Sequence, residues 1–203
     1  MTKVNYLKFM ENAKKVAKTV KGRPILKGVE HREDGTLTVT DSHRLYRAYN
    51  VNAPKNTIIH AETGEVLDLG NYPNTDNLIT SDEPIATIDF SDLKAIIKKL
   101  KAIQSVGVAN GLKKDSTIVT IENGVISLDT ENPDDIQASI SYTSTNEMKI
   151  YLSLQYFIEI FEFFESMNCD QLTLQYYSPY KPLKFISKHN DNLVAILLGV
   201  RKA

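Results

Sequence analysis

The sequence contains no tryptophan and a single cysteine among its 203 residues. Cys169 therefore has no partner for a disulfide within the chain, and the four histidines lack the spacing of a zinc site. No segment approaches the roughly 20 apolar residues that span a bilayer, and the N-terminus has no apolar run typical of a signal peptide. We expect a cytoplasmic protein that uses no metal or cofactor and has no membrane partner.

The composition does provide enough apolar sequence for a sizeable core. Hydrophobic residues make up 42% of the chain and charged residues 24%, as in an ordinary globular protein. The length fits one large or two small domains. A net charge of −1 excludes a uniformly basic nucleic-acid-binding protein, but it allows a basic face, because the local potential depends on where the charges lie.

Hydrophobic periodicity predicts a helix followed by short strands in the first part of the chain. Apolar residues at spacings of three and four predict an amphipathic helix over 6–20, which ends before Gly22 and Pro24. Turn residues at 71–76 lead to a predicted domain boundary near 80–83. The predicted strands of this part are 25–32, 36–41, 45–49, 57–60 and 66–69.

The second part reads as a helix, a hairpin, two strands, a second helix and three strands. Ser91 is predicted to cap a helix over 93–103, and Ser153 a helix over 154–167. Asn123-Gly124 is a strong signal for a tight hairpin turn. Two helix-plus-strand units in succession indicate an internal duplication. The predicted strands of this part are 117–121, 125–129, 136–142, 148–152, 172–176, 183–186 and 193–200.

The segment TDSHRLYRA at 40–48 interrupts a strand pattern with consecutive polar side chains. Residues 36–40 alternate polar and apolar, Asp41 to Arg44 break the alternation, and the extended pattern resumes at Leu45. Asp and Ser favour turns, because their side chains hydrogen-bond to the neighbouring backbone. The residues alone favour a surface turn. The alternative is a polar segment that presents its side chains to a partner.

Three stretches resemble the bacterial DNA polymerase III beta subunit, the sliding clamp: GRPILKGV, LTVTDSHRLYRA and the C-terminal LVAILLGVRKA. They occur in the order found in that family, and the resemblance extends over most of the chain. It implies an α+β, DNA-clamp-like fold of antiparallel sheets with helices packed on one face. Subunits of that family have three domains. Residues 1–80 resemble the second domain in shortened form, and residues 81–203 resemble a nearly complete third domain.

The resemblance also implies a peptide-binding groove between the two domains. Ser42 stands where the family often has glycine, Gly199 replaces the usual proline, and Lys202-Ala203 replace a terminal leucine. An apolar cleft with a polar rim suits a short peptide with leucine or phenylalanine anchors. Without the resemblance, Ile196 and Leu198 would be ordinary core residues of a last strand. The implied groove residues are Thr40, Ser42, His43, Arg44, Leu45, Pro73, Leu78, Ile196, Leu198 and Val200.

Exposed lysines on two predicted helices form the second candidate site. In a ring lined by helices they would contact the phosphates of double-stranded DNA without sequence preference. The alternative, slightly favoured by the residues alone, is a solvated helix face. Glu159, Glu162 and Glu165 on the third predicted helix oppose the DNA interpretation, because they would repel DNA if they faced the hole of the ring. The lysines are Lys14, Lys15 and Lys18 on the first helix and Lys94, Lys98, Lys99 and Lys101 on the second.

The residue pattern does not favour an enzyme. Asp41, Ser42 and His43 are adjacent, but neighbours on an extended chain point to opposite faces instead of converging. The leading hypothesis is a clamp-like DNA replication processivity factor that tethers a polymerase or clamp loader through a peptide. Because rings of this general architecture contain six domains, three copies of a two-domain chain would form a homo-oligomeric ring. The alternative is a peptide-binding adaptor or decoy that forms no ring.

Overall fold

The computed structural model describes residues 4–79, 82–114, 117–122, 124–129, 139–188 and 191–201. Parts of the predicted boundary at 80–83, of the Asn123-Gly124 turn and of the strand at 136–142 lie outside these residues.

We call residues 4–79 the first half and residues 82–201 the second half. The first half contains α1 (Tyr6–Thr19), β1 (Gly28–His31), β2 (Leu37–Thr40), β3 (Arg44–Ala48) and β4 (Thr57–His60). The second half contains β5 (Ala86–Ser91), α2 (Leu93–Ala109), β6 (Ile118–Glu122), β7 (Val125–Leu128), β8 (Ser139–Ser141), β9 (Lys149–Ser153), α3 (Leu154–Ser166), β10 (Gln171–Tyr176), β11 (Leu183–Ser187) and β12 (Leu193–Leu197).

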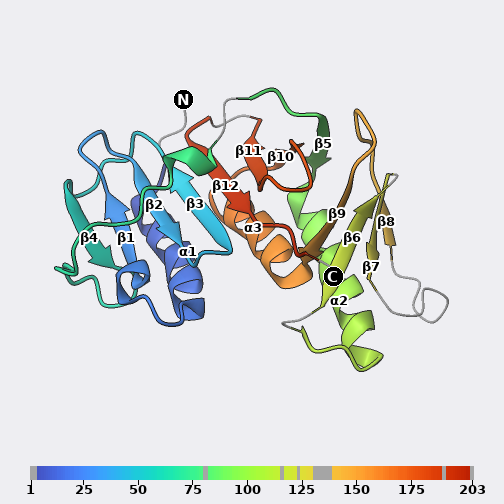
Figure 1. Ribbon diagram of the computed structural model, residues 1–203, viewed down its shortest axis with the longest axis horizontal. Coiled ribbons are helices and arrows are strands. Elements are labelled where there is room, and N and C mark those ends of the chain that lie inside the picture. Colours follow the sequence, from blue (N-terminus) through green and yellow to red (C-terminus); the bar gives the residue numbers. More distant parts are fainter. Residues whose placement is uncertain are drawn as a thin grey trace.

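One eight-stranded sheet runs through both halves in the order β4-β1-β2-β3-β12-β11-β10-β5. The halves join where β3 pairs antiparallel with β12, with Leu45 opposite Ile196. A short turn connects β2 to β3, so the polar residues 41–43 lie at one end of this seam (Figure 1). The last strand of the chain is thereby built into the sheet of the first half.

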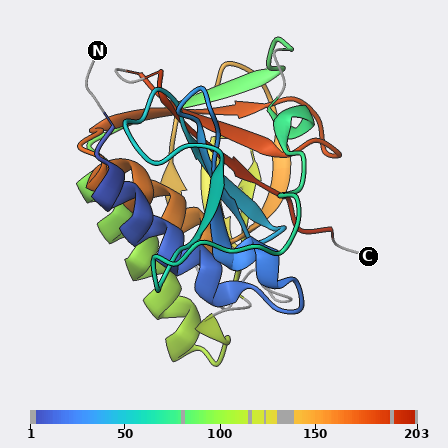
Figure 2. The ribbon, with the colours of Figure 1, turned by 90° about the vertical axis from the view of Figure 1, so that its left-hand side faces the viewer.

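The helices α1, α2 and α3 lie side by side in one layer, with α3 between the other two (Figures 1 and 2). The α1 helix packs on β2, α3 packs on β9 and β12, and α2 packs on β5 and β7. The contacts of α2 and α3 thus include the second sheet, whose order is β8-β7-β6-β9. Within the described ranges, none of the helices is both long and apolar enough to cross a bilayer.

The α3 helix is the centre of the core. Phe157, Phe161, Phe163 and Phe164 on this helix are all 0% exposed, because apolar side chains cover more than one of its faces. The predicted cap is confirmed: the Ser153 side chain accepts a hydrogen bond from the Tyr156 amide. The α3 helix packs against both halves: Phe163 stacks on Tyr46 of β3, and Phe157 contacts Phe90 of β5.

Two predicted strands of the first half are wrong in part. Residues 25–27 belong to a 3-10 turn, and β1 begins only at Gly28. Pro24 opens this turn, because its ring fixes φ and removes a backbone donor. Residues 66–69 form no strand, and only Val66 makes an isolated bridge, to Ile59.

The start of the second half also differs from the prediction. Residues 86–91 form β5, a strand that the sequence analysis missed although Ala86, Ile88 and Phe90 alternate with polar residues. Ser91 is the last residue of this strand and does not cap α2. The cap is Asp92, whose side chain accepts a hydrogen bond of 3.1 Å from the Ala95 amide.

Candidate functional site

A cavity of about 250 Å³ opens where the β2–β3 turn, the segment 73–78 and the end of β12 converge. Nine of the ten predicted groove residues line it. Arg23, Leu26, Asn74 and Thr75 also line it, and the sequence analysis did not assign them to the groove. Arg23 and Leu26 belong to the GRPILKGV stretch that carried the resemblance, so that stretch held a usable signal. The nine predicted residues are Thr40, Ser42, His43, Arg44, Leu45, Pro73, Leu78, Ile196 and Leu198.

The apolar floor of this cavity is formed by paired residues of β3 and β12. Leu45 and Ile196 are opposite each other and buried, and together with Val194 they form a small cluster separate from the main core. Leu78 packs against this cluster. Leu198, just beyond β12, is 41% exposed. The cavity therefore presents apolar surface to solvent.

The turn at one wall is held by its own side chains. The Asp41 carboxylate accepts hydrogen bonds from the amides of His43 and Arg44, at 3.0 and 2.9 Å. Its other oxygen accepts a bond of 2.6 Å from the Thr19 hydroxyl of α1. Ser42 has a φ of +75°, a conformation that favours glycine. The turn predicted from Asp and Ser is confirmed.

Arg44 differs from the other groove residues because its guanidinium lies on the helix side of the sheet. It pairs with Asp41 at 3.3 Å and with Glu159 of α3, and it lies 4.5 Å from the ring centre of Tyr156. The side chain is 0% exposed. Leu45 points to the outer face, as alternation along a strand requires. Arg44 therefore contributes main chain to the cavity wall, and its charge anchors the turn to the helix layer.

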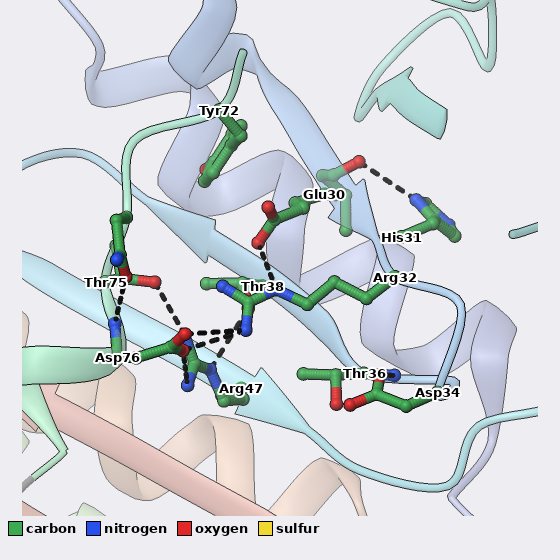
Figure 3. Close-up of polar contacts among 12 residues, drawn as sticks. Glu30, His31, Arg32, Asp34, Thr36, Thr38, Arg47, Tyr72, Thr75 and Asp76 are labelled. Atoms are coloured by element: carbon green, nitrogen blue, oxygen red, sulfur yellow. Dashed lines mark hydrogen bonds and ion pairs between the residues drawn. The ribbon is translucent and has the colours of Figure 1, made fainter. Parts of the chain in front are cut away.

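The segment 71–79 is held against the outer face by a polar network (Figure 3). The Asp76 carboxylate accepts hydrogen bonds from Arg32 at 2.8 Å and from Arg47 at 2.7 Å. Arg47 also donates to the Thr75 hydroxyl, and the Tyr72 hydroxyl accepts from the Thr40 amide. The hydrogen bond from Arg32 is the main reason that the pKa of Asp76 lies below its ordinary value. This network places Pro73 and Leu78 beside the groove, and no sequence spacing predicted it.

Val200 lies apart from the predicted groove set. It lines a neighbouring cavity of about 550 Å³ together with Lys149, Tyr151 and Tyr180, and Leu198 borders both cavities. The Val200 amide donates a hydrogen bond of 2.8 Å to the Tyr151 carbonyl of β9. The chain end thus runs along the edge of the second sheet instead of staying in the groove.

The helix layer carries all seven predicted lysines on its exposed side. Lys15 and Lys101 flank Glu162 of α3, at 3.5 and 2.7 Å, and Lys94 lies 3.7 Å from Glu165. Burial would raise the pKa of Glu162, but the two lysines outweigh burial and lower it. Among the described residues, Lys14, Lys18, Lys98 and Lys99 have no carboxylate within ion-pair distance.

The glutamates of α3 are thus matched by cations from its neighbours. Glu159 pairs with the buried Arg44, and Glu162 and Glu165 pair with lysines of α1 and α2. The sequence predicted that these glutamates would repel DNA if they faced the hole of a ring. Because each one is paired, the repulsion from this helix is smaller than the sequence suggested.

The chain has the fold of bacterial sliding clamps, as the resemblance implied. The DNA polymerase III beta chain of Streptococcus pneumoniae TIGR4 matches it with a TM-score of 0.72 at 17% identity, over 100% of this chain and 66% of that one. The beta subunit of Streptococcus pyogenes gives 0.73 at 16% identity, over 100% and 68%. The sliding clamp of Bacillus subtilis gives 0.70 at 17% identity, over 100% and 67%.

No protein-family model and no curated protein sequence matches the chain. The α+β fold class with helices on one face is confirmed by the solved structures. The chain spans about two thirds of the length of these clamps. Identities of 16–17% establish the fold alone.

Proposed function

We propose that this chain is a clamp-like processivity factor that binds a short peptide of a polymerase or clamp loader in the groove and contacts double-stranded DNA through its helix layer. The observation that carries the proposal is the apolar cavity of about 250 Å³ at the β3–β12 seam. Leu45, Ile196 and Leu78 offer the apolar surface. Ser42, His43 and Asn74 are polar residues of the cavity lining. An apolar pocket with a polar rim suits leucine or phenylalanine anchors.

A fluorescence anisotropy titration with a labelled peptide carrying leucine and phenylalanine anchors tests the groove. Leu198→Asp places a charge at the cavity and should weaken binding at least about tenfold, because the buried contact is replaced by a desolvated carboxylate. Leu7→Asp makes the same change at an exposed residue of α1, 71% exposed and outside the cavity, and should leave the affinity unchanged. Equal affinity of all three proteins would remove the groove from the proposal.

The proposed DNA contacts are Lys14, Lys18, Lys98 and Lys99, because a lysine without an internal carboxylate partner keeps its full charge for phosphate. Lys98→Glu with Lys99→Glu should abolish retention on circular DNA and spare peptide binding. The control is Lys21→Glu with Lys55→Glu, which changes the net charge equally away from α2. Equal DNA retention in the two double variants would contradict the assignment of α2 to the DNA face.

A second candidate function is a non-ring adaptor or decoy for proteins with clamp-binding peptides. It is favoured by the end strands of the large sheet, which already have backbone partners. His60 and Ile58 of β4 bond with Glu65 and Leu67, and Thr145 donates to Thr87 of β5. Pairing with a neighbouring molecule through these edges would require displacement of the covering segments.

The mass in solution separates the two functions. Light scattering over a range of concentrations should give a trimer for a closed ring of three two-domain chains. A monomer at every concentration, together with intact peptide binding, would favour the adaptor. In that case the Lys98 and Lys99 variants should behave like the unmodified protein on circular DNA.

A further inference from the structure

A second charged cavity lies in the first half, away from the groove. It has a volume of about 240 Å³ and lies between the last turns of α1 and the adjoining ends of β1 and β4. Lys14, Lys18, Lys27 and His60 all line it, and Glu62 is the one carboxylate among its lining residues. Lys27 and His60 belong to neither of the proposed sites described above.

The fold brings these basic residues together from three elements. Lys14 and Lys18 are four residues apart on α1, so they lie on the same helix face. Lys27 precedes Gly28, which pairs with His60 at the end of β4. The Ala61 amide donates a hydrogen bond of 2.9 Å to the Lys27 carbonyl, and this bond holds the two strand ends together. Backbone hydrogen bonds therefore hold the Lys27 and His60 positions next to each other.

The lining of this cavity contains more positive than negative side chains. In the described part of the chain, Lys14, Lys18 and Lys27 make no ion pair, whereas Lys15, only one residue from Lys14, pairs with Glu162. Three ammonium groups around one cavity repel one another, and a single carboxylate compensates for one of them. Such a cluster creates a positive potential that attracts an anion.

His60 supplies a fixed donor to the same cavity. Its Nδ1 atom accepts hydrogen bonds from the amides of Glu62 and Thr63, both at 3.2 Å. An acceptor at Nδ1 requires the proton to be on Nε2 in the neutral ring. Nε2–H is then available for donation, because no hydrogen bond joins it to another described residue. A ring N–H donor beside several ammonium groups suits an oxyanion with several acceptor oxygens.

We propose that this cavity, which we call the α1–β4 site, binds a phosphate group through Lys14, Lys18, Lys27 and His60 Nε2–H. The phosphate belongs either to a small phosphorylated ligand or to a nucleic-acid backbone. The inference goes beyond the proposed clamp function, because it needs neither a ring nor a bound peptide. Lys14 and Lys18 are shared with the proposed DNA face, whereas Lys27 and His60 distinguish this site from a general basic surface.

A titration with inorganic phosphate tests the site, with backbone amide shifts of residues 27–28 and 61–63 as the readout. Ionic strength is held constant with chloride. We expect saturable shifts at these residues and in the last turns of α1, which also line the cavity. Lys27→Met should weaken binding about tenfold, because one charge-assisted hydrogen bond is lost. His60→Asn should weaken it similarly, and its side-chain oxygen can still accept from the 62–63 amides, which preserves the turn.

The matched control is Lys21→Met, which removes the same charge from an exposed lysine that does not line the cavity. Its phosphate affinity should equal that of the unmodified protein. Equal weakening by Lys21→Met, or unsaturable shifts spread over all exposed lysines, would overturn the site. Because this titration contains no DNA, its outcome is independent of whether the Lys98 and Lys99 variants lose DNA retention.

A parallel titration with a short DNA duplex identifies the source of the phosphate. If Lys27→Met weakens the binding of both phosphate and duplex relative to Lys21→Met, the site holds a backbone phosphate. If it weakens inorganic phosphate alone, the site holds a small phosphorylated ligand. Either result supports a phosphate site. Loss of duplex binding without any effect on inorganic phosphate would contradict it.

Discussion

The two halves of the molecule differ in where the partners of their buried aromatic rings come from. The second half packs Phe157 of α3 against Phe90, Phe161 and Phe185, all from its own elements. The first half has a single helix. Its Tyr46 stacks on Phe163 of α3, with ring centres 4.2 Å apart. The buried residues of both halves form one main core. Within it Phe157 contacts rings of its own half, whereas Tyr46 of the first half relies on Phe163, from a helix of the second half.

Polar contacts follow the same division. Arg44 of β3 pairs with Glu159 of α3, and Asn12 of α1 donates a hydrogen bond of 2.8 Å to Ser166 of α3. Both Arg44 and Asn12 are buried. A buried polar group without a partner is costly, so separation of the first half from α3 would be unfavourable. The groove at the β3–β12 seam depends on this contact between the first half and α3.

The largest effect is expected from removal of the Arg44 charge. Arg44→Met leaves the carboxylates of Asp41 and Glu159 without their cation, and should lower the free energy of unfolding by at least about 3–5 kcal/mol. Urea denaturation measures this loss. Adding Glu159→Gln should restore part of the stability, because one unpaired charge is removed. If the single variant is as stable as the double variant, the pair does not hold the halves together.

Substitution of either of two phenylalanines of α3 should lower the stability by a similar amount but affect different halves of the molecule. Phe163→Ala and Phe157→Ala should each cost about 3–5 kcal/mol, as is usual for a large buried ring. Hydrogen exchange should show that Phe163→Ala reduces protection more in β1–β3, and that Phe157→Ala reduces it more in β10 and β11. The same pattern of exchange in both variants would contradict the dependence of the first half on Phe163.

A smaller effect of the opposite sign is expected at the groove turn. Ser42→Gly should stabilise the protein by up to about 1 kcal/mol, because glycine adopts a positive φ without strain. Thermal unfolding measures the change. The control is Ser105→Gly in the interior of α2, where the same substitution should destabilise by about 0.5 kcal/mol. A loss of stability at both positions would show that the Ser42 conformation carries no strain.

The smallest effect concerns Asp76, which is exposed on one side. Arg32 and Arg47 lower its pKa in the folded state, so it contributes stability above its unfolded pKa of about 3.9. That contribution is lost as the pH falls through the lower, folded value. The stability difference between the unmodified protein and Asp76→Asn should therefore shrink below about pH 4. Asp68→Asn, which neutralises an exposed carboxylate outside the network, is the matched control.

Local signals predicted helices and turns better than short strands. The spacing of apolar residues predicted α1 within one residue at its end, and Ser153 identified the start of α3. The prediction of a strand at 25–27 was wrong because Pro24 favours a tight turn. The strand β5 was not predicted because its residues follow the segment assigned as a domain boundary. Strands depend on partners distant in sequence, so short alternating patterns carry a weak signal.

The helix periodicities, the Asp-Ser turn and the stretches that resemble a sliding clamp could all be read from the amino-acid sequence. These features depend on interactions within a few residues or on short contiguous motifs. The three-dimensional packing places Arg44 toward the helix layer and Leu45 toward the groove, and it brings Asp76 to two arginines. The same packing pairs the glutamates of α3. Each of these outcomes depends on side chains that are far apart in the chain, and only the packing of both halves on α3 and the β3–β12 seam brings them together.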